Sequence, residues 1–233
     1  MKSNSDLVLL IDKPSGYTSF DVVAIVRKYI RQATSNRKIK VGHAGTLDPM
    51  ATGLLIVLTG KMTKQQDSFM KKDKTYEAEI TLGAVSDTDD AEGNIVMSKV
   101  ECRKSKTDIE KTLMSFVGES EQMPPQYSAI KVAGKKAYEV ARKGGTTELK
   151  ARKVRIYSIE NVKINGNKLS FTTKVSSGTY IRSIARDLGQ KLGCGGYLSK
   201  LRRIKIDEFD VNKAYPISEI NLTLLEKMVA TTE

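Results

Sequence analysis

Histidine, cysteine and tryptophan are scarce in this sequence of 233 residues, which contains one histidine, two cysteines and no tryptophan. One histidine cannot build a zinc site rich in His ligands, and it makes a Ser-His-Asp triad hard to assemble. The cysteines, Cys102 and Cys194, are far apart in the sequence and lack metal-ligand spacing. We therefore expect no metal site and a reducing compartment, in which both thiols act as small apolar side chains.

Long apolar segments are lacking as well. The run Leu7–Ile11 is too short for the apolar core of a signal peptide, and no other run approaches the length of a membrane span. These features predict a cytoplasmic protein without a membrane partner.

Acidic residues are fewer than basic ones: the sequence contains 39 Lys and Arg and 27 Asp and Glu, which gives a formal net charge of +12. Such a surplus attracts polyanions, most simply nucleic acid. Charge alone leaves open a protein that is merely basic, so RNA or DNA binding is only favoured at this point.

Hydrophobic periodicity predicts both strands and helices, without a regular alternation between the two. We expect strands at 7–11, 54–58, 75–82, 154–164, 168–175 and 201–206. We expect helices at 108–117, 135–143, 179–192 and 217–229, and one beginning at Thr18, whose apolar face holds Phe20, Val23, Val26 and Ile30. Hairpins and long excursions connect the strands, which favours a mixed α+β fold with a mostly antiparallel sheet flanked by helices.

The most unusual segment is the Gly-rich stretch from Gly42 to Gly53, which contains three glycines and Pro49 and precedes an apolar strand. Asp48 lies directly before Pro49, and this position disfavours a helical backbone at Asp48. Its carboxylate is therefore expected to project from a turn or an extended segment. An ordinary Asx-Pro turn explains this pattern equally well. A phosphate-binding P-loop does not, because the required Lys and Ser/Thr are missing at the expected spacing.

Five blocks of the sequence are similar, in order and spacing, to motifs of the TruB-type tRNA pseudouridine synthases. The similarity runs from about Val8 to Asp210. The blocks are Lys13-Pro14-Ser15-Gly16 with Thr18-Ser19, Gly42 to Leu55, Lys74 to Ala78, Val175 to Ser183, and Tyr197 to Ile204. The resemblance implies a pseudouridine synthase fold and an isomerase that converts uridine 55 in the T loop of tRNA to pseudouridine.

The resemblance also implies roles for individual residues. Asp48 is the expected nucleophile, which attacks either the sugar C1′ or C6 of the base, and Arg182 is its expected cationic partner. Tyr76 is expected to stack on the uracil ring and to assist proton transfer at C5. Tyr180 and Leu201 are expected to complete the pocket, while His43 supports the loop from which the target base is flipped out. The reaction needs no cofactor or metal.

A basic insertion at about 124–152 resembles the family's thumb-like RNA-binding segment. Between Lys135 and Arg155 lie eight Lys or Arg and two Glu, a net charge of +6. The candidate RNA-binding residues are Lys64, Lys131, Arg142, Lys143, Arg152, Arg202 and Arg203. Asp90, in an acidic loop, is expected to orient active-site groups.

We interpret residues 1–233 as a single catalytic domain without the C-terminal PUA-type domain of many family members, and expect a monomer that binds the tRNA T stem-loop. Three alternatives stay open. They are a guide-RNA-dependent synthase of the dyskerin type, a synthase of another family acting on ribosomal RNA, and a non-catalytic tRNA-binding or tRNA-folding protein.

Overall fold

The computed structural model describes residues 5–102, 104–132 and 134–230. The chain forms two compact units: unit 1 comprises the residues up to Tyr76 and those from Arg202 onward, and unit 2 comprises Glu77–Leu201. The two long strands β4 (Lys74–Leu82) and β12 (Gly196–Ile206) contribute residues to both units.

Unit 1 is built around strand β3 (Thr52–Thr59). It pairs antiparallel with β1 (Val8–Lys13) and with β2 (Val41–His43), and parallel with the end of β12. The remaining elements of unit 1 are α1 (Ser19–Ala33), η1 (Gly60–Gln65), α2 (Gln66–Met70), β13 (Phe209–Asp210), η2 (Val211–Lys213), β14 (Tyr215–Pro216), η3 (Ile217–Glu219) and α6 (Leu222–Ala230). The apolar run of β3 is continuous because both of its faces are buried.

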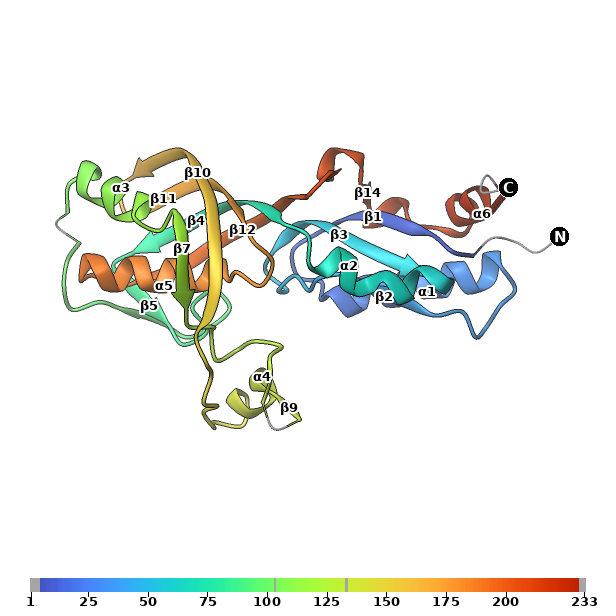
Figure 1. Ribbon diagram of the computed structural model, residues 1–233, viewed down its shortest axis with the longest axis horizontal. Coiled ribbons are helices and arrows are strands. Elements are labelled where there is room, and N and C mark those ends of the chain that lie inside the picture. Colours follow the sequence, from blue (N-terminus) through green and yellow to red (C-terminus); the bar gives the residue numbers. More distant parts are fainter. Residues whose placement is uncertain (1–4, 103, 133, 231–233) are drawn as a thin grey trace. The chain divides into compact units, whose positions relative to one another are not determined.

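Helices cover one of these faces, where Leu55 and Val57 of β3 share a core with residues of α1 and α6. These two helices pack together; Figure 1 draws α1 in blue and α6 in red. Leu54, Ile56 and Leu58 face the opposite way and pack with Phe69 of α2. This alternation fixes the register of β3, since a shift by one residue would exchange the two faces.

Unit 2 contains the sheet order β12-β4-β11-β10-β7. Strands β10 (Arg152–Asn165) and β11 (Lys168–Val175) form the expected hairpin, and β7 (Gly118–Gln122) pairs antiparallel with β10 at the sheet edge. The remaining elements are β5 (Ala84–Ser86), β6 (Ile95–Met97), α3 (Lys106–Met114), β8 (Lys131–Val132), β9 (Lys135–Lys136), α4 (Ala137–Ala141) and α5 (Ile181–Leu192). Figure 1 shows α4 and β9 extending away from this sheet. The predicted mixed, mostly antiparallel sheet with flanking helices is confirmed.

The predicted start of α1 is confirmed in detail, because Thr18 and Asp21 form a reciprocal capping box. Its predicted apolar face is wrong at one position: Phe20 is 64% exposed, whereas Val22 is buried. The predicted terminal helix 217–229 is interrupted at Ile220, which is buried in the core. Asn221 then accepts a hydrogen bond from Leu224 N, a side-chain cap that starts α6 anew.

The predicted helix 135–143 is shorter than expected. Its first residues form β9, and only α4 is helical. The backbone N–H groups of Ala137 and Tyr138 donate to the carbonyls of Ile130 and Ser128, which tie α4 to the preceding segment of the insertion. No helix within the described residues is both long and apolar enough to cross a membrane.

Candidate active site

Asp48 lies in the loop that connects β2 to β3 in unit 1, and its side chain is half-buried. The backbone N–H of Ala51 donates to the Asp48 carbonyl at 3.1 Å, which closes a turn around Pro49. At the start of the loop, Ala44 N donates to the carbonyl of Ile56 on β3 at 2.9 Å. The Asp48 backbone is therefore held in a defined turn, as the Asp-Pro sequence predicts.

The first of the five similar sequence blocks supports this loop through Lys13, whose side chain is fully buried. Its ammonium group donates to three backbone carbonyls, those of Pro14, Tyr17 and Pro49, at 2.9, 2.7 and 3.1 Å. The N–H of Gly16 donates to the same Pro49 carbonyl at 2.9 Å. A buried charge is expensive unless hydrogen bonds satisfy it, so this lysine fixes the loop immediately after Asp48.

Ser19, at the start of α1, fixes the loop immediately before Asp48. Its buried hydroxyl donates to the Leu47 carbonyl at 3.1 Å and accepts from Leu47 N at 2.9 Å. The segments similar to the family's N-terminal and catalytic motifs are thus in direct contact, on both sides of the candidate nucleophile.

Arg203 of β12 supplies a third support and corrects one prediction. Its side chain is only 1% exposed, and it donates to the carbonyls of Leu54 at 2.7 Å and Gly45 at 3.0 Å. The expected phosphate contact of Arg203 is therefore wrong, because its charge is used inside the fold. Gly53 allows the close approach of β12: its φ is +101°, and a Cβ there would lie 2.3 Å from the Arg203 carbonyl oxygen.

His43 lies at the end of β2 and is 9% exposed. Burial, with the nearby positive charge of Arg203, lowers the pKa of His43 to about 4. The ring meets Phe20 edge-on at a centroid distance of 5.3 Å, and its Nδ1 atom has no hydrogen-bond partner among the described residues. The imidazole is therefore neutral at physiological pH and packs as an aromatic group, which agrees with a supporting role.

Arg182 belongs to unit 2 and lies in the first turn of α5. It is 5% exposed, which excludes an ordinary surface arginine. Its guanidinium donates to the carbonyls of Thr88 at 3.1 Å and Tyr127 at 2.9 Å and forms an ion pair with Asp90 at 3.3 Å. Thr88 in turn donates its hydroxyl to Asp90 at 2.6 Å. The acidic loop therefore orients Arg182, the kind of role that was expected of Asp90.

Arg186 and Asp89 form a second pair that the sequence reasoning missed. Their ion pair measures 3.0 Å, and Arg186 also donates to the Met123 carbonyl at 2.9 Å. Burial raises the pKa of Asp89, although the charges of Arg186 and Arg182 oppose this shift. The signal was the spacing of four between the two arginines, which places them on one face of a helix.

The remaining predicted pocket residues are Tyr76 on β4, Tyr180 directly before α5, and Leu201 on β12. Tyr76 is buried on β4 in unit 1, whereas Tyr180 and Leu201 are half-buried in unit 2. The Gln122 side chain accepts from Tyr180 N at 2.8 Å and donates to the Tyr180 carbonyl at 3.0 Å, so it fixes the backbone before α5. Since Asp48 and Arg182 belong to different units, their pairing stays a prediction.

Comparisons with known proteins identify the family of the chain. The N-terminal domain model of the TruB family pseudouridylate synthases matches residues 31–181, and the tRNA pseudouridylate synthase B C-terminal domain matches residues 182–231. The chain belongs to the TruB family.

Relatives of this TruB-family chain are similar over most of its length. The tRNA pseudouridine synthase B of Opitutus terrae is 42% identical over 228 residues, which cover 94% of this chain and 92% of that protein. The tRNA pseudouridine synthase B of Aquifex aeolicus is 44% identical over 219 residues, which cover 92% of this chain and 73% of that protein.

Solved structures confirm the pseudouridine synthase fold of the TruB-family chain. A chain in a Cbf5–Nop10–Gar1 complex matches with 27% identity and a TM-score of 0.67, covering 100% of this chain and 57% of that one. An H/ACA RNP bound to a substrate RNA containing 2′-deoxyuridine gives 26% identity and a TM-score of 0.64, covering 94% and 53%. The chain thus spans slightly more than half the length of these two structures.

The candidate RNA-binding residues of this TruB-family chain differ in exposure. Lys64 on η1 is exposed, as are Lys131, Arg142, Lys143 and Arg152 in or beside the insertion. Arg202 is half-buried, and its guanidinium pairs with Asp12 at 2.7 Å. The RNA contacts of these residues stay predictions.

Proposed function

We propose that this chain isomerises uridine 55 in the T loop of tRNA to pseudouridine, as an intramolecular transferase of the TruB family. The observation that carries this proposal is the loop around Asp48, which Lys13, Ser19 and Arg203 hold from three directions. A carboxylate on a backbone held this firmly is suited to nucleophilic catalysis, since little reorganisation of the loop is needed at the moment of attack. Relatives that are 42% to 44% identical bear the name tRNA pseudouridine synthase B.

The chemistry breaks the glycosidic C–N bond, turns the base over and forms a C–C bond to the same sugar. Atoms are conserved and no net oxidation occurs, so a nucleophile and a proton acceptor at C5 suffice. We assign nucleophilic attack to Asp48, and stacking and proton transfer at C5 to Tyr76. Tyr180 and Leu201 provide apolar walls that exclude water from the covalent intermediate.

We assign electrostatic support of Asp48 to Arg182. Its guanidinium cannot lose its proton in a protein, so it can hold a carboxylate ionised in a dry pocket. The Asp90 carboxylate and the carbonyls of Thr88 and Tyr127 already fix its position within unit 2. This preorganisation supports the assignment, because a fixed cation loses little side-chain entropy when it meets a charge.

The reacting uridine has to leave its stack before Asp48 can reach it. The neutral, buried ring of His43 supports the idea that this residue packs against RNA or the loop and does not transfer protons. A basic surface that includes the insertion is expected to bind the surrounding T arm. The monomeric state and the cytoplasmic location stay predictions.

A guide-RNA-dependent synthase is the main alternative. The H/ACA RNP and Cbf5-containing structures are only 26% to 27% identical to this chain. The relatives named tRNA pseudouridine synthase B reach 46% identity. This difference favours a protein that acts on tRNA alone.

The test incubates the purified chain with an unmodified RNA stem-loop that corresponds to the T arm, and then maps the position of pseudouridine. We expect product at position 55 from the wild type and from Asp67→Asn, a control on the exposed side of α2. We expect no product from Asp48→Asn, with RNA binding retained. Product at another position would refute the substrate assignment, and full activity of Asp48→Asn would refute the mechanism.

A further inference from the structure

A groove with a volume of about 400 Å³ lies on unit 1, and four cationic side chains line it. Arg27 and Arg31 come from α1, and Lys38 and Lys40 come from the segment that leads into β2. Its other lining residues are Ile39 of that segment and residues of β2, η1 and α2, and none of the lining residues is acidic. We call this feature the α1–β2 groove.

The positive charge of the α1–β2 groove is not compensated within the fold. Six Lys or Arg and no Asp or Glu lie between Asp21 and Asp48 in the sequence. Among the described residues, none of the four cations of the groove forms an ion pair, and Arg27 donates only to the Val41 carbonyl, at 3.3 Å. Like charges that are gathered without a counter-charge repel one another and attract an anion.

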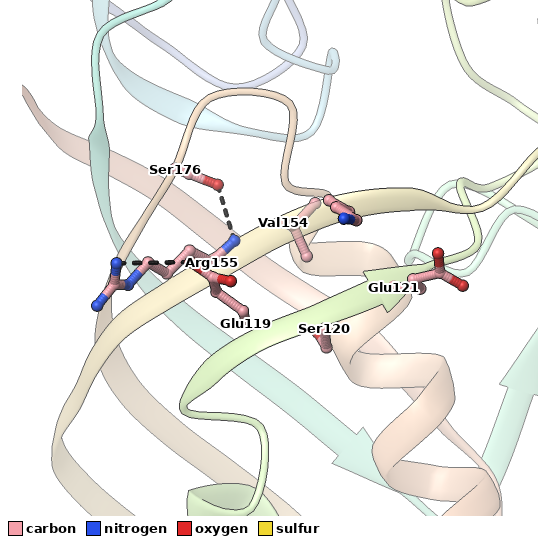
Figure 2. Close-up of a pocket in the computed structure, with 7 residues that line it drawn as sticks. Glu119, Ser120, Glu121, Val154, Arg155 and Ser176 are labelled. Carbon is pink, nitrogen blue, oxygen red and sulfur yellow. Dashed lines mark hydrogen bonds and ion pairs between the residues drawn. The ribbon is translucent and has the colours of Figure 1, made fainter.

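The pocket on unit 2 provides a contrast (Figure 2). It has a volume of about 370 Å³ and is lined by Lys153 and Arg155 but also by Glu119 and Glu121. Arg155 forms an ion pair with Glu119 at 3.6 Å. The charges of that pocket compensate one another, whereas those of the α1–β2 groove are of one sign.

The backbone beneath the groove is well anchored. Ile39, between Lys38 and Lys40, is 5% exposed and belongs to the core under α1. Lys38 N donates to the Asn36 side chain at 3.0 Å, and Gly60 N donates to the Lys40 carbonyl at 2.9 Å. The backbone that carries the cations is therefore already ordered, so the binding of an anion costs little backbone conformational entropy.

The groove is continuous with the segment that carries the candidate nucleophile. Gly42 lines the groove and belongs to β2, which leads directly into the Asp48 loop. Thr63 of η1 also lines it, and Lys64, already a candidate RNA contact, is the next residue of that helix. The groove lies at the Thr59 end of β3 and the Asp48 loop at its Thr52 end, so we expect the groove to meet phosphates at some distance from the reacting uridine.

We propose that the α1–β2 groove binds backbone phosphates of the substrate tRNA and so positions the RNA for reaction at Asp48. The proposal rests on the proposed function. Phosphate contacts from Lys and Arg supply most of the sequence-independent affinity for nucleic acid and fix its register. The cations of the groove are positioning residues, and they take no part in the chemical step.

The test compares two variants that lose equal charge. Arg31→Gln/Lys38→Gln/Lys40→Gln removes three exposed cations of the groove and keeps Arg27, which supports β2. The control, Lys104→Gln/Lys106→Gln/Lys111→Gln, removes three exposed lysines in and beside α3. Those lysines flank Asp108 and Glu110, so their field is already partly cancelled.

Binding of an unmodified tRNA transcript is measured between low and moderate salt, together with kcat and KM for pseudouridine formation. We expect the groove variant to bind about tenfold or more weakly near physiological salt. The magnitude of its slope of log K against log salt should fall by about two to three, because each of the three phosphate contacts contributes roughly 0.7–0.9. KM should rise with the Kd, while kcat at saturating tRNA stays within about twofold.

The control variant should keep most of the wild-type affinity and slope. A thermal unfolding scan checks that the groove variant is folded, and Lys38→Gln/Lys40→Gln, a smaller change, should give an intermediate slope. Equal binding by the groove variant and the control would overturn the proposal, as would a fall in kcat without a change in Kd. Absence of pseudouridine with the wild-type chain would instead refute the proposed function, and the binding data would still decide the groove.

Discussion

Replacement of Arg203 by methionine tests whether a buried cation holds the candidate catalytic loop in place. The guanidinium donates to the carbonyls of Leu54 on β3 and Gly45 in the loop, and the side chain is 1% exposed. Methionine keeps much of the volume and the apolar stem but removes both donors. The variant therefore isolates the hydrogen bonds from the packing.

The magnitude follows from these two contacts. A hydrogen bond that involves a charged group contributes roughly 1.5–3 kcal/mol, so two such bonds give about 3–6 kcal/mol. Removal of the cation also removes the cost of burying it, which offsets part of this loss. We expect the free energy of unfolding to fall by about 3 kcal/mol, which lowers the urea midpoint by roughly 1–2 M.

Urea unfolding of Arg203→Met is compared with that of Arg202→Met, the neighbouring position on the same strand. Arg202 is half-buried and pairs with Asp12, and such an ion pair contributes only about 0.2–1 kcal/mol. Pseudouridine formation by Arg203→Met should also fall, because Gly45 loses its anchor to β12. Equal stability of the two variants would refute the view that Arg203 holds the loop.

Three further predictions concern the same supports. Gly53→Ala should lower the free energy of unfolding by at least ~3 kcal/mol, because φ at Gly53 is +101° and the new Cβ would meet the backbone of β12. Gly16→Ala, with φ +84° and open space around the new Cβ, should lower it by only about 1 kcal/mol. Urea unfolding measures both losses, and equal losses would contradict this prediction. The pKa of His43 is about 4 in the fold and 6.5 ordinarily, so between these pH values the unfolded chain binds one more proton and stability falls as the pH falls. His43→Gln should remove roughly 3 kcal/mol of this loss. An unchanged pH profile of unfolding would contradict this prediction. Asp90→Asn breaks a buried ion pair with Arg182 and should lower stability by about 3 kcal/mol and reduce kcat more than it raises KM, whereas unchanged kcat would show that Asp90 does not position Arg182.

Local sequence rules predicted the elements that depend on local interactions. The capping box of α1 and the hairpin between β10 and β11 are set by residues close together in the chain. The helix α5 was expected from its apolar periodicity, and the structure confirms it with a start two residues later. The predicted helix in the insertion was too long, because tertiary hydrogen bonds replace part of its internal ones.

The candidate site was predicted in part. The blocks around Asp48 and Arg182 were identified through their resemblance to a family, and composition alone left Asp48 open to interpretation as a simple turn. The burial of Arg203 was not predictable, since Lys, Arg and acidic residues are usually exposed. The acid-free interval between Asp21 and Asp48 is visible in the sequence, although the insertion carries more positive charge.

The family, the order of the motifs, the positive charge and the apolar run of β3 can all be read from the order of the residues. Which charged side chains serve the fold and which face the solvent follows only from the folded arrangement. Arg203 and Gly53 are neighbours only because β12 pairs with β3 across a long separation in the chain. Arg182 meets Asp90 only because the acidic loop folds back onto α5. Electrostatic free energy depends on distance and burial, and neither quantity is encoded by the spacing of residues along the chain.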